Sequence, residues 1–99
     1  MRIGTTPTYT FELPFDTDAV VVVELTFSQN NAIILQKSEA DCEMGENVIA
    51  CKLSQEDTFL FTDGVIVEYQ LRVKDRNSDV FETDVLREDC LKSLSKKVL

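Results

Sequence analysis

Residues 65–74, which read VIVEYQLRVK, decide the fold class of this chain. The odd-numbered positions of this stretch are all apolar, and the even-numbered positions after Ile66 are all polar or charged. Successive side chains of a β-strand point to opposite faces of a sheet, so this period of two gives one apolar face and one polar face. The stretch therefore predicts a half-buried antiparallel strand.

The same alternation predicts further strands over residues 8–13, 19–28 and 48–53. In the second of these it places four apolar side chains on the inward face: Val21, Val23, Leu25 and Phe27. Valine is frequent here, and its branched side chain fits the pleated surface of a sheet. Pro14 ends the first strand, because proline has no N–H to donate to a neighbouring strand.

Short polar segments separate the predicted strands. Asn30 and Asn31 precede an apolar run over residues 32–35, and asparagine tolerates the positive φ angles of a tight hairpin. A second hairpin is expected to turn through the acidic loop at residues 44–46, and a third through residues 75–79.

Residues 54–60 depart from the period of two. Ser54 stands three residues before Asp57, the spacing of a capping box that satisfies free N–H groups at a helix start. The pattern breaks at Asp63, so one short helical turn fits better than a full helix. Capping also explains Ser54 better than nucleophilic catalysis does, because Lys52 is the only base near it in sequence.

Six or seven short strands separated by turns predict an all-β fold, an immunoglobulin-like antiparallel β-sandwich with one short helical turn near residues 54–60. A small up-and-down or Greek-key barrel is the alternative, since the number of strands does not fix their connectivity. A chain of 99 residues has room for one core. We therefore expect a single domain over residues 1–91, followed by a basic C-terminal tail over residues 92–99.

The charge of the chain narrows its possible functions. It has 18 acidic and 10 basic residues and no histidine, for a net charge of −8. Nonspecific nucleic-acid binding depends on lysine and arginine, so we expect no nucleic-acid partner and favour basic protein partners. Without histidine the chain lacks Ser-His and Cys-His pairs and histidine-based metal sites. The sequence therefore argues against an enzyme and predicts no cofactor.

The start of the chain turns polar after Ile3 and does not resemble an export signal. The longest apolar run, residues 19–23, is far shorter than the ~20 residues that a membrane span needs. We therefore expect synthesis in the cytoplasm and no association with a membrane.

The three cysteines are Cys42, Cys51 and Cys90. The cytoplasm keeps thiols reduced, so we favour free, half-buried thiols, with Cys51 on the inward face. A Cys42–Cys51 disulfide is the alternative, because these residues would flank the turn at Gly45 on neighbouring strands. Three cysteines without histidine are a weak signal for zinc, whose structural sites use four ligands.

Two groups of carboxylates are candidate sites. The first has oxygen ligands suited to a calcium ion and consists of Glu39, Asp41, Glu43 and Glu46. It lacks the ligand spacing of a calcium-binding loop, and we interpret it as a solvated turn. The second is Asp16 with Asp18. Acid–base catalysis would need a pocket that raises the pKa of one of them, so we expect Asp16 to cap or turn the chain instead.

The sequence leaves the end of the chain open. We expect a last strand from Val80 to about Cys90, because the long strand over residues 65–74 needs a partner of similar length. The apolar residues from Leu86 onward also have helix-like spacing, although strand followed by an irregular tail is favoured.

Charge separates the tail from the body. Residues 1–91 hold all 18 acidic residues and seven basic ones, a net charge of −11, whereas the tail carries +3. This pattern suggests head-to-tail association and makes six residues candidates for an interaction surface: Leu91, Lys92, Leu94, Lys96, Lys97 and Val98. The tail would dock on a neighbouring molecule, fold back over the edge of its own sandwich, or fray, and the sequence leaves these outcomes open.

Three motifs resemble a known family. They are Gly4-Thr5-Thr6-Pro7 with Thr10-Phe11-x-Leu13, Leu53-Ser54-Gln55-Glu56-Asp57-Thr58 with Leu60-Phe61, and Val67-x-x-Gln70-Leu71-Arg72-Val73. They resemble small prophage proteins of clostridia and related bacteria, which are similar to the immunoglobulin-like N-terminal domains of phage baseplate upper proteins. The resemblance covers nearly the whole chain, but Lys92 and Ser93 stand where the family has a glycine. It carries no catalytic or binding residues.

Two functions of different classes follow. The resemblance implies a non-enzymatic structural protein of phage or prophage origin, associated with a tail or baseplate in the virion, whose partners are other phage tail proteins or its own copies. The alternative is a small acidic inhibitor that imitates DNA and binds a basic host protein. Bases such as Arg72 and Lys74 are interspersed among the acids, which weighs against a continuous phosphate-like face.

Overall fold

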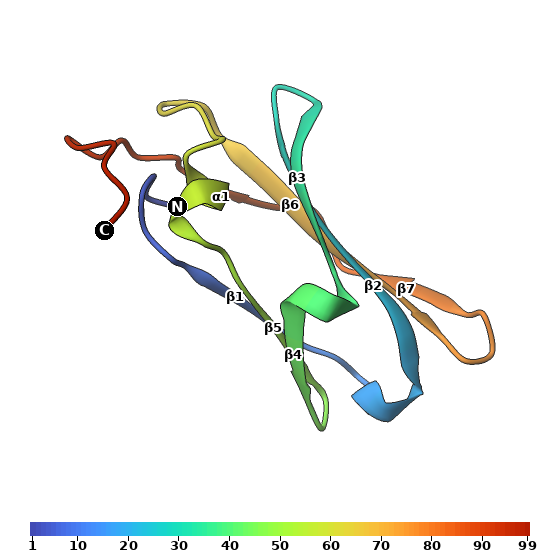
Figure 1. Cartoon of the computed structure of the whole chain (residues 1–99). Helices are drawn as coiled ribbons and strands as arrows, with labels where there is room; N and C mark the ends of the chain where they lie inside the picture. Colours follow the sequence, from blue (N-terminus) through green and yellow to red (C-terminus); the bar gives the residue numbers. More distant parts are fainter.

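Two antiparallel sheets pack face to face in the computed structural model, which describes all 99 residues (Figure 1). The smaller sheet has the order β1 (Thr8–Glu12), β5 (Val48–Lys52) and β4 (Cys42–Gly45). The larger has the order β3 (Ala32–Ser38), β2 (Val20–Gln29), β6 (Val67–Asp75) and β7 (Val80–Glu82), and β8 (Leu86–Glu88) also pairs with β6. The predicted all-β antiparallel sandwich is confirmed.

The predicted last strand is interrupted, and β7 and β8 are its two pieces. Thr83 lies between them, its N–H donating to the Leu71 carbonyl at 3.0 Å and its hydroxyl accepting the Leu71 N–H at 3.2 Å. A side-chain oxygen thus replaces a carbonyl of the ladder, which breaks the regular register. The structure has eight strands, or seven if β7 and β8 are counted as one interrupted strand.

Two local predictions are confirmed by the backbone. Asn30 and Asn31 have φ angles of 51° and 63°, the left-handed conformation of a tight β2–β3 hairpin. The Ser54 hydroxyl accepts the Asp57 N–H at 3.0 Å, and the Asp57 carboxylate accepts the Ser54 N–H at 2.9 Å. This capping box starts the one-turn helix α1 (Gln55–Thr58).

The core lies between the sheets. Its fourteen buried residues are Tyr9, Phe11, Leu13, Val23, Leu25, Phe27, Ile49, Cys51, Leu53, Phe61, Val67, Leu71, Val73 and Cys90. The prediction that Val21 points inward is wrong, because its side chain is 46% exposed. The β2–β6 register shifts between Val20 and Val22, which changes the phase of the alternation at the start of β2.

Cys42 and Cys51 form a disulfide, so the prediction of free thiols is wrong for this pair. The β4–β5 register places them directly opposite each other, with Cα atoms 4.4 Å apart. That distance permits a bond, and the register that sets it depends on pairing that the alternation alone does not reveal. Cys90 is free, as predicted, and burial raises the pKa of its thiol.

The molecule is elongated, with extents of 46 × 28 × 16 Å. Both termini and α1 lie at one end, which we name the helix end (Figure 1). The β1–β2, β4–β5 and β6–β7 connections lie at the opposite end, which we name the loop end. The two ends differ in charge.

Candidate interaction surface at the helix end

The C-terminal tail begins against the N-terminal segment of its own chain. Ile3 donates its N–H to the Leu91 carbonyl at 2.9 Å, and Leu91 donates to the Met1 carbonyl at 2.9 Å, which forms a parallel bridge. The Arg2 guanidinium continues the contact by donating to the Lys92 carbonyl at 2.7 Å. Of the outcomes left open by the sequence, the structure shows the tail folded back on its own domain.

The far end of the tail is held by α1. Leu99 donates its N–H to the Gln55 side-chain oxygen at 2.7 Å, and the Gln55 amide nitrogen lies 3.4 Å from the Leu99 carbonyl. Between these anchors the tail has no regular secondary structure, and the Ser95 hydroxyl accepts the Lys97 N–H at 3.1 Å. The tail is therefore an irregular segment fixed at both ends.

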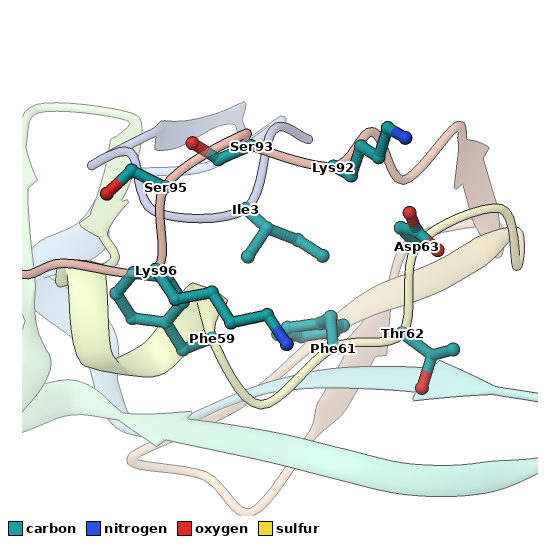
Figure 2. Close-up of a pocket in the computed structure, with 9 residues that line it drawn as sticks. All are labelled: Ile3, Phe59, Phe61, Thr62, Asp63, Lys92, Ser93, Ser95 and Lys96. Carbon is teal, nitrogen blue, oxygen red and sulfur yellow. The ribbon is translucent and has the colours of Figure 1, made fainter.

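A hollow of about 520 Å³ lies beneath the tail (Figure 2). The body contributes Ile3, Phe59, Phe61, Thr62 and Asp63, and the tail contributes Lys92, Ser93, Ser95 and Lys96. The floor is apolar and the rim is polar. In Figure 2 the Lys96 side chain extends across the hollow toward Phe61, whereas the Lys92 amine points away from it.

The six predicted interaction residues fall into three groups. Lys92 and Lys96 line the hollow. Leu91 pairs with Arg2 through its backbone. The side chains of Leu91 and Val98 are both 47% exposed. Leu94 is 98% exposed, and Lys97 is exposed as well. All six thus belong to the segment that folds back at the helix end, although the side chains of Lys92 and Lys96 point in different directions (Figure 2).

The apolar floor of the hollow was not predicted from the sequence. Ile3, Phe59 and Phe61 come from segments more than 50 residues apart, and only folding brings them together. The apolar run at residues 59–61 was the available signal, but the alternation pattern does not assign it to a surface hollow.

A partly buried charge pair fixes the N-terminal segment on which the tail rests. The Met1 ammonium lies 3.2 Å from the Glu88 carboxylate and donates to the Asp89 carbonyl at 2.7 Å. The Tyr9 hydroxyl donates to the same Glu88 carboxylate. Burial, together with this carboxylate, raises the pKa of Tyr9, so the phenol stays protonated and continues to donate.

The loop end gathers acidic side chains from three connections. The 3-10 turn η1 (Thr17–Ala19) joins them, because Thr17 donates its N–H to the Glu46 carbonyl at 2.7 Å and Arg76 donates to the Asp18 carbonyl at 3.0 Å. The acids of these connections are Asp16, Asp18, Glu46 and Asp79, together with Asp75 at the end of β6. Arg76 is their one basic residue, so the loop end is strongly negative.

Asp16 caps η1, as predicted, and accepts the Asp18 N–H at 2.9 Å. Asp75 accepts the N–H groups of Asn77 and Asp79, both at 2.9 Å. The carboxylates of Asp18, Glu46 and Asp79 make no hydrogen bond within the chain and remain available to a partner.

The acidic loop at residues 39–46 is divided by its own backbone contacts. The carboxylate of Glu39 accepts N–H groups of Glu39 itself and of Val23, the latter at 3.1 Å, which holds its pKa below the usual range. Asp41 accepts the Ser38 N–H at 2.9 Å and caps the 3-10 turn η2 (Glu39–Asp41). The carboxylates of the acidic loop do not converge as a set of metal ligands.

α1 is four residues long, and no helix of the chain is long and apolar enough to cross a bilayer. Comparison with protein families, with curated proteins and with solved structures finds no significant match to this chain.

Proposed function

We propose that the chain is a non-enzymatic structural protein that joins an assembly through its helix end. The observation that carries this proposal is Leu94, which stands 98% exposed among lysines on a tail anchored at both ends. Burying a leucine side chain contributes about 1.5–3 kcal/mol of free energy, so a fully exposed leucine is a suitable anchor for a partner. An apolar residue ringed by charge is a common arrangement at protein interfaces.

The chemistry around the hollow supports binding rather than catalysis. Its hydroxyls are Thr62, Ser93 and Ser95, and Ser95 accepts the Lys97 N–H. None of them is hydrogen-bonded to a basic side chain that would activate it as a nucleophile. The two lysines and the apolar floor instead suit an acidic protein surface that carries an aliphatic side chain.

The resemblance to small prophage proteins gives this proposal its setting, a phage tail or baseplate. A sandwich of this size suits a building block, because its two sheets hold the ends at a fixed separation along a 46 Å axis. A module of this kind works through surfaces rather than through a reactive centre.

The test is whether the chain is incorporated into phage particles. The chain is co-expressed with its neighbouring genes, and particles are separated on a density gradient. We expect the wild-type chain in the particle fractions, and we expect Lys96→Glu/Lys97→Glu to shift to the free fractions. Lys52→Glu/Arg87→Glu, which makes the same charge change on exposed strand positions that line neither hollow, is the matched control. A wild-type chain found only in free fractions overturns the proposal.

The acidic inhibitor is the second candidate, and the five carboxylates of the loop end favour it. In the same gradient, the inhibitor function predicts that the free chain sediments in a defined complex with a basic host protein. It also predicts that Glu46→Lys/Asp79→Lys abolishes that complex, whereas the tail variant leaves it intact.

A further inference from the structure

We propose that this chain binds further copies of itself head to tail, with the helix end of one copy seated on the loop end of the next. This inference rests on the proposed function and names the partner of the helix end. Such an interface joins two different surfaces, so it repeats along an open filament or closes into a ring.

Charge is the first argument. The basic residues Arg2, Lys92, Lys96 and Lys97 lie at the helix end, and five acids lie at the loop end. The helix end also holds five acids, of which Asp57 is paired with Lys37 at 2.9 Å and Glu88 with the Met1 ammonium at 3.2 Å; the others are Glu56, Asp63 and Asp89. The positive charge is therefore concentrated on the tail, which carries three lysines and no acidic side chain. Opposite charges on the tail of one copy and on the loop end of the next would steer the copies into this orientation.

Apolar complementarity is the second argument. Leu94 projects from the helix end with nothing covering it. On the outer face of the larger sheet, beside the β6–β7 turn, a hollow of about 170 Å³ lies between Val22 and Val80. Those two side chains are 43% and 56% exposed, and the charged residues lining the hollow are Glu24, Arg72 and Lys74, of which Arg72 is paired with Glu24 at 3.8 Å and with Glu82 at 3.3 Å. The hollow has room for one aliphatic side chain, and we assign Leu94 of the neighbouring copy to it.

Symmetric pairing is disfavoured by the same charges. Two helix ends facing each other would set Lys96 and Lys97 against their own copies, and two loop ends would oppose carboxylates such as Glu46 and Asp79. Like charges held at an interface cost several kcal/mol. Head-to-tail contact is the arrangement that pairs each end with its opposite.

Two charge-reversed variants test the proposal. The tail-reversed variant is Lys92→Glu/Lys96→Glu/Lys97→Glu, and the loop-reversed variant is Asp18→Lys/Glu46→Lys/Asp79→Lys. None of these six side chains makes an ion pair or side-chain hydrogen bond within the chain, so both variants should fold. Glu43→Lys/Asp84→Lys, which removes exposed acids between the two ends, is the control.

The measurement is sedimentation velocity over a concentration series, at low salt and at about 0.5 M salt, where charges are screened within a few ångströms. We expect the wild-type chain and the control to form larger species with increasing concentration at low salt. Each reversed variant alone should associate about tenfold more weakly or remain monomeric. An equal mixture of the two should associate again, because each then presents the charge that the other lacks.

The apolar contact has its own test. Leu94→Ser should weaken self-association without changing charge, whereas Ile33→Ser, at a residue 64% exposed on the edge strand β3, should leave it unchanged. A wild-type chain that is monomeric at every concentration overturns the head-to-tail proposal, as does a mixture of reversed variants that stays monomeric. A monomeric chain that still enters particles overturns this inference alone, and a chain that self-associates but never enters particles overturns the proposed function alone.

Discussion

The side chain of Gln55 holds the backbone of Leu99, with its oxygen accepting the Leu99 N–H at 2.7 Å and its nitrogen 3.4 Å from the Leu99 carbonyl. These residues are 44 positions apart. The contact makes the course of the tail depend on α1, which the capping box of Ser54 and Asp57 sets in place. A local helix signal therefore positions a distant interaction surface.

Replacing Gln55 tests this dependence. Gln55→Ala should release the end of the tail and increase fast backbone motion over residues 96–99, as measured by ¹⁵N relaxation. The contact is exposed, so the free energy of unfolding should fall by no more than about 0.5–1 kcal/mol. Gln36→Ala, which removes an exposed hydrogen bond to Thr26, is the control. Unchanged relaxation in the tail would show that Gln55 does not hold it.

Thr58 links α1 to the N-terminal segment. Its hydroxyl is fully buried, accepts the Gly4 N–H at 2.8 Å and donates to the Gln55 carbonyl at 2.9 Å. Thr58→Val keeps the shape but leaves the Gly4 N–H without this acceptor, so urea denaturation should show a loss of about 1–3 kcal/mol. Thr58→Ser keeps the hydroxyl and should lose only about 0.8 kcal/mol for one methyl group. Equal losses in the two variants would contradict a role for the hydroxyl.

The disulfide should contribute measurably to stability. Cys42→Ser opens a loop with a sequence separation of 9, for which loop-closure entropy gives a loss of roughly 2–3 kcal/mol. Adding a reductant to the wild-type chain should lower its free energy of unfolding by a similar amount. The reductant should have no further effect on Cys42→Ser. If wild-type stability is the same with and without reductant, the bond does not stabilise this hairpin.

Asp57 should make stability depend on pH on the acid side. Burial opposes its charge, but the hydrogen bonds from Lys37 and Ser54 prevail and hold the pKa of this carboxyl below its usual range. A carboxyl with a lowered folded-state pKa stabilises the protein above its unfolded pKa of about 4, and this stabilisation is lost as the pH falls through the folded-state value. The sign is therefore a loss of stability on acidification.

The measurement compares the wild-type chain with Asp57→Asn by urea denaturation between pH 7 and pH 2. At pH 7 the variant should be less stable by about 1 kcal/mol, from a lost ion pair and a weakened cap. The difference should shrink below pH 4 as the wild-type carboxyl becomes protonated. Glu56→Gln, at the neighbouring exposed acid of the same helical turn, should show no such convergence. A difference that stays constant with pH would rule out the charge of Asp57 as its source.

The sequence by itself determined the features that depend on neighbouring residues. The alternation around Leu71 specified the sandwich, because strand geometry places side chains two apart on the same face. Asn30 and Asn31 specified a hairpin, and Ser54 with Asp57 specified the start of α1, because these motifs are complete within a few residues. The sign of the charge on the body and on the tail was also readable from composition.

Only the tertiary structure decided which distant residues meet. The β4–β5 register brought Cys42 opposite Cys51, and the Thr83 hydroxyl interrupted the last strand by bonding to Leu71. Packing also carried the tail back across Ile3 and gathered the acidic connections at the opposite end. Each of these contacts depends on strand register and chain direction, which alternation leaves undetermined because every register in steps of two buries the same face.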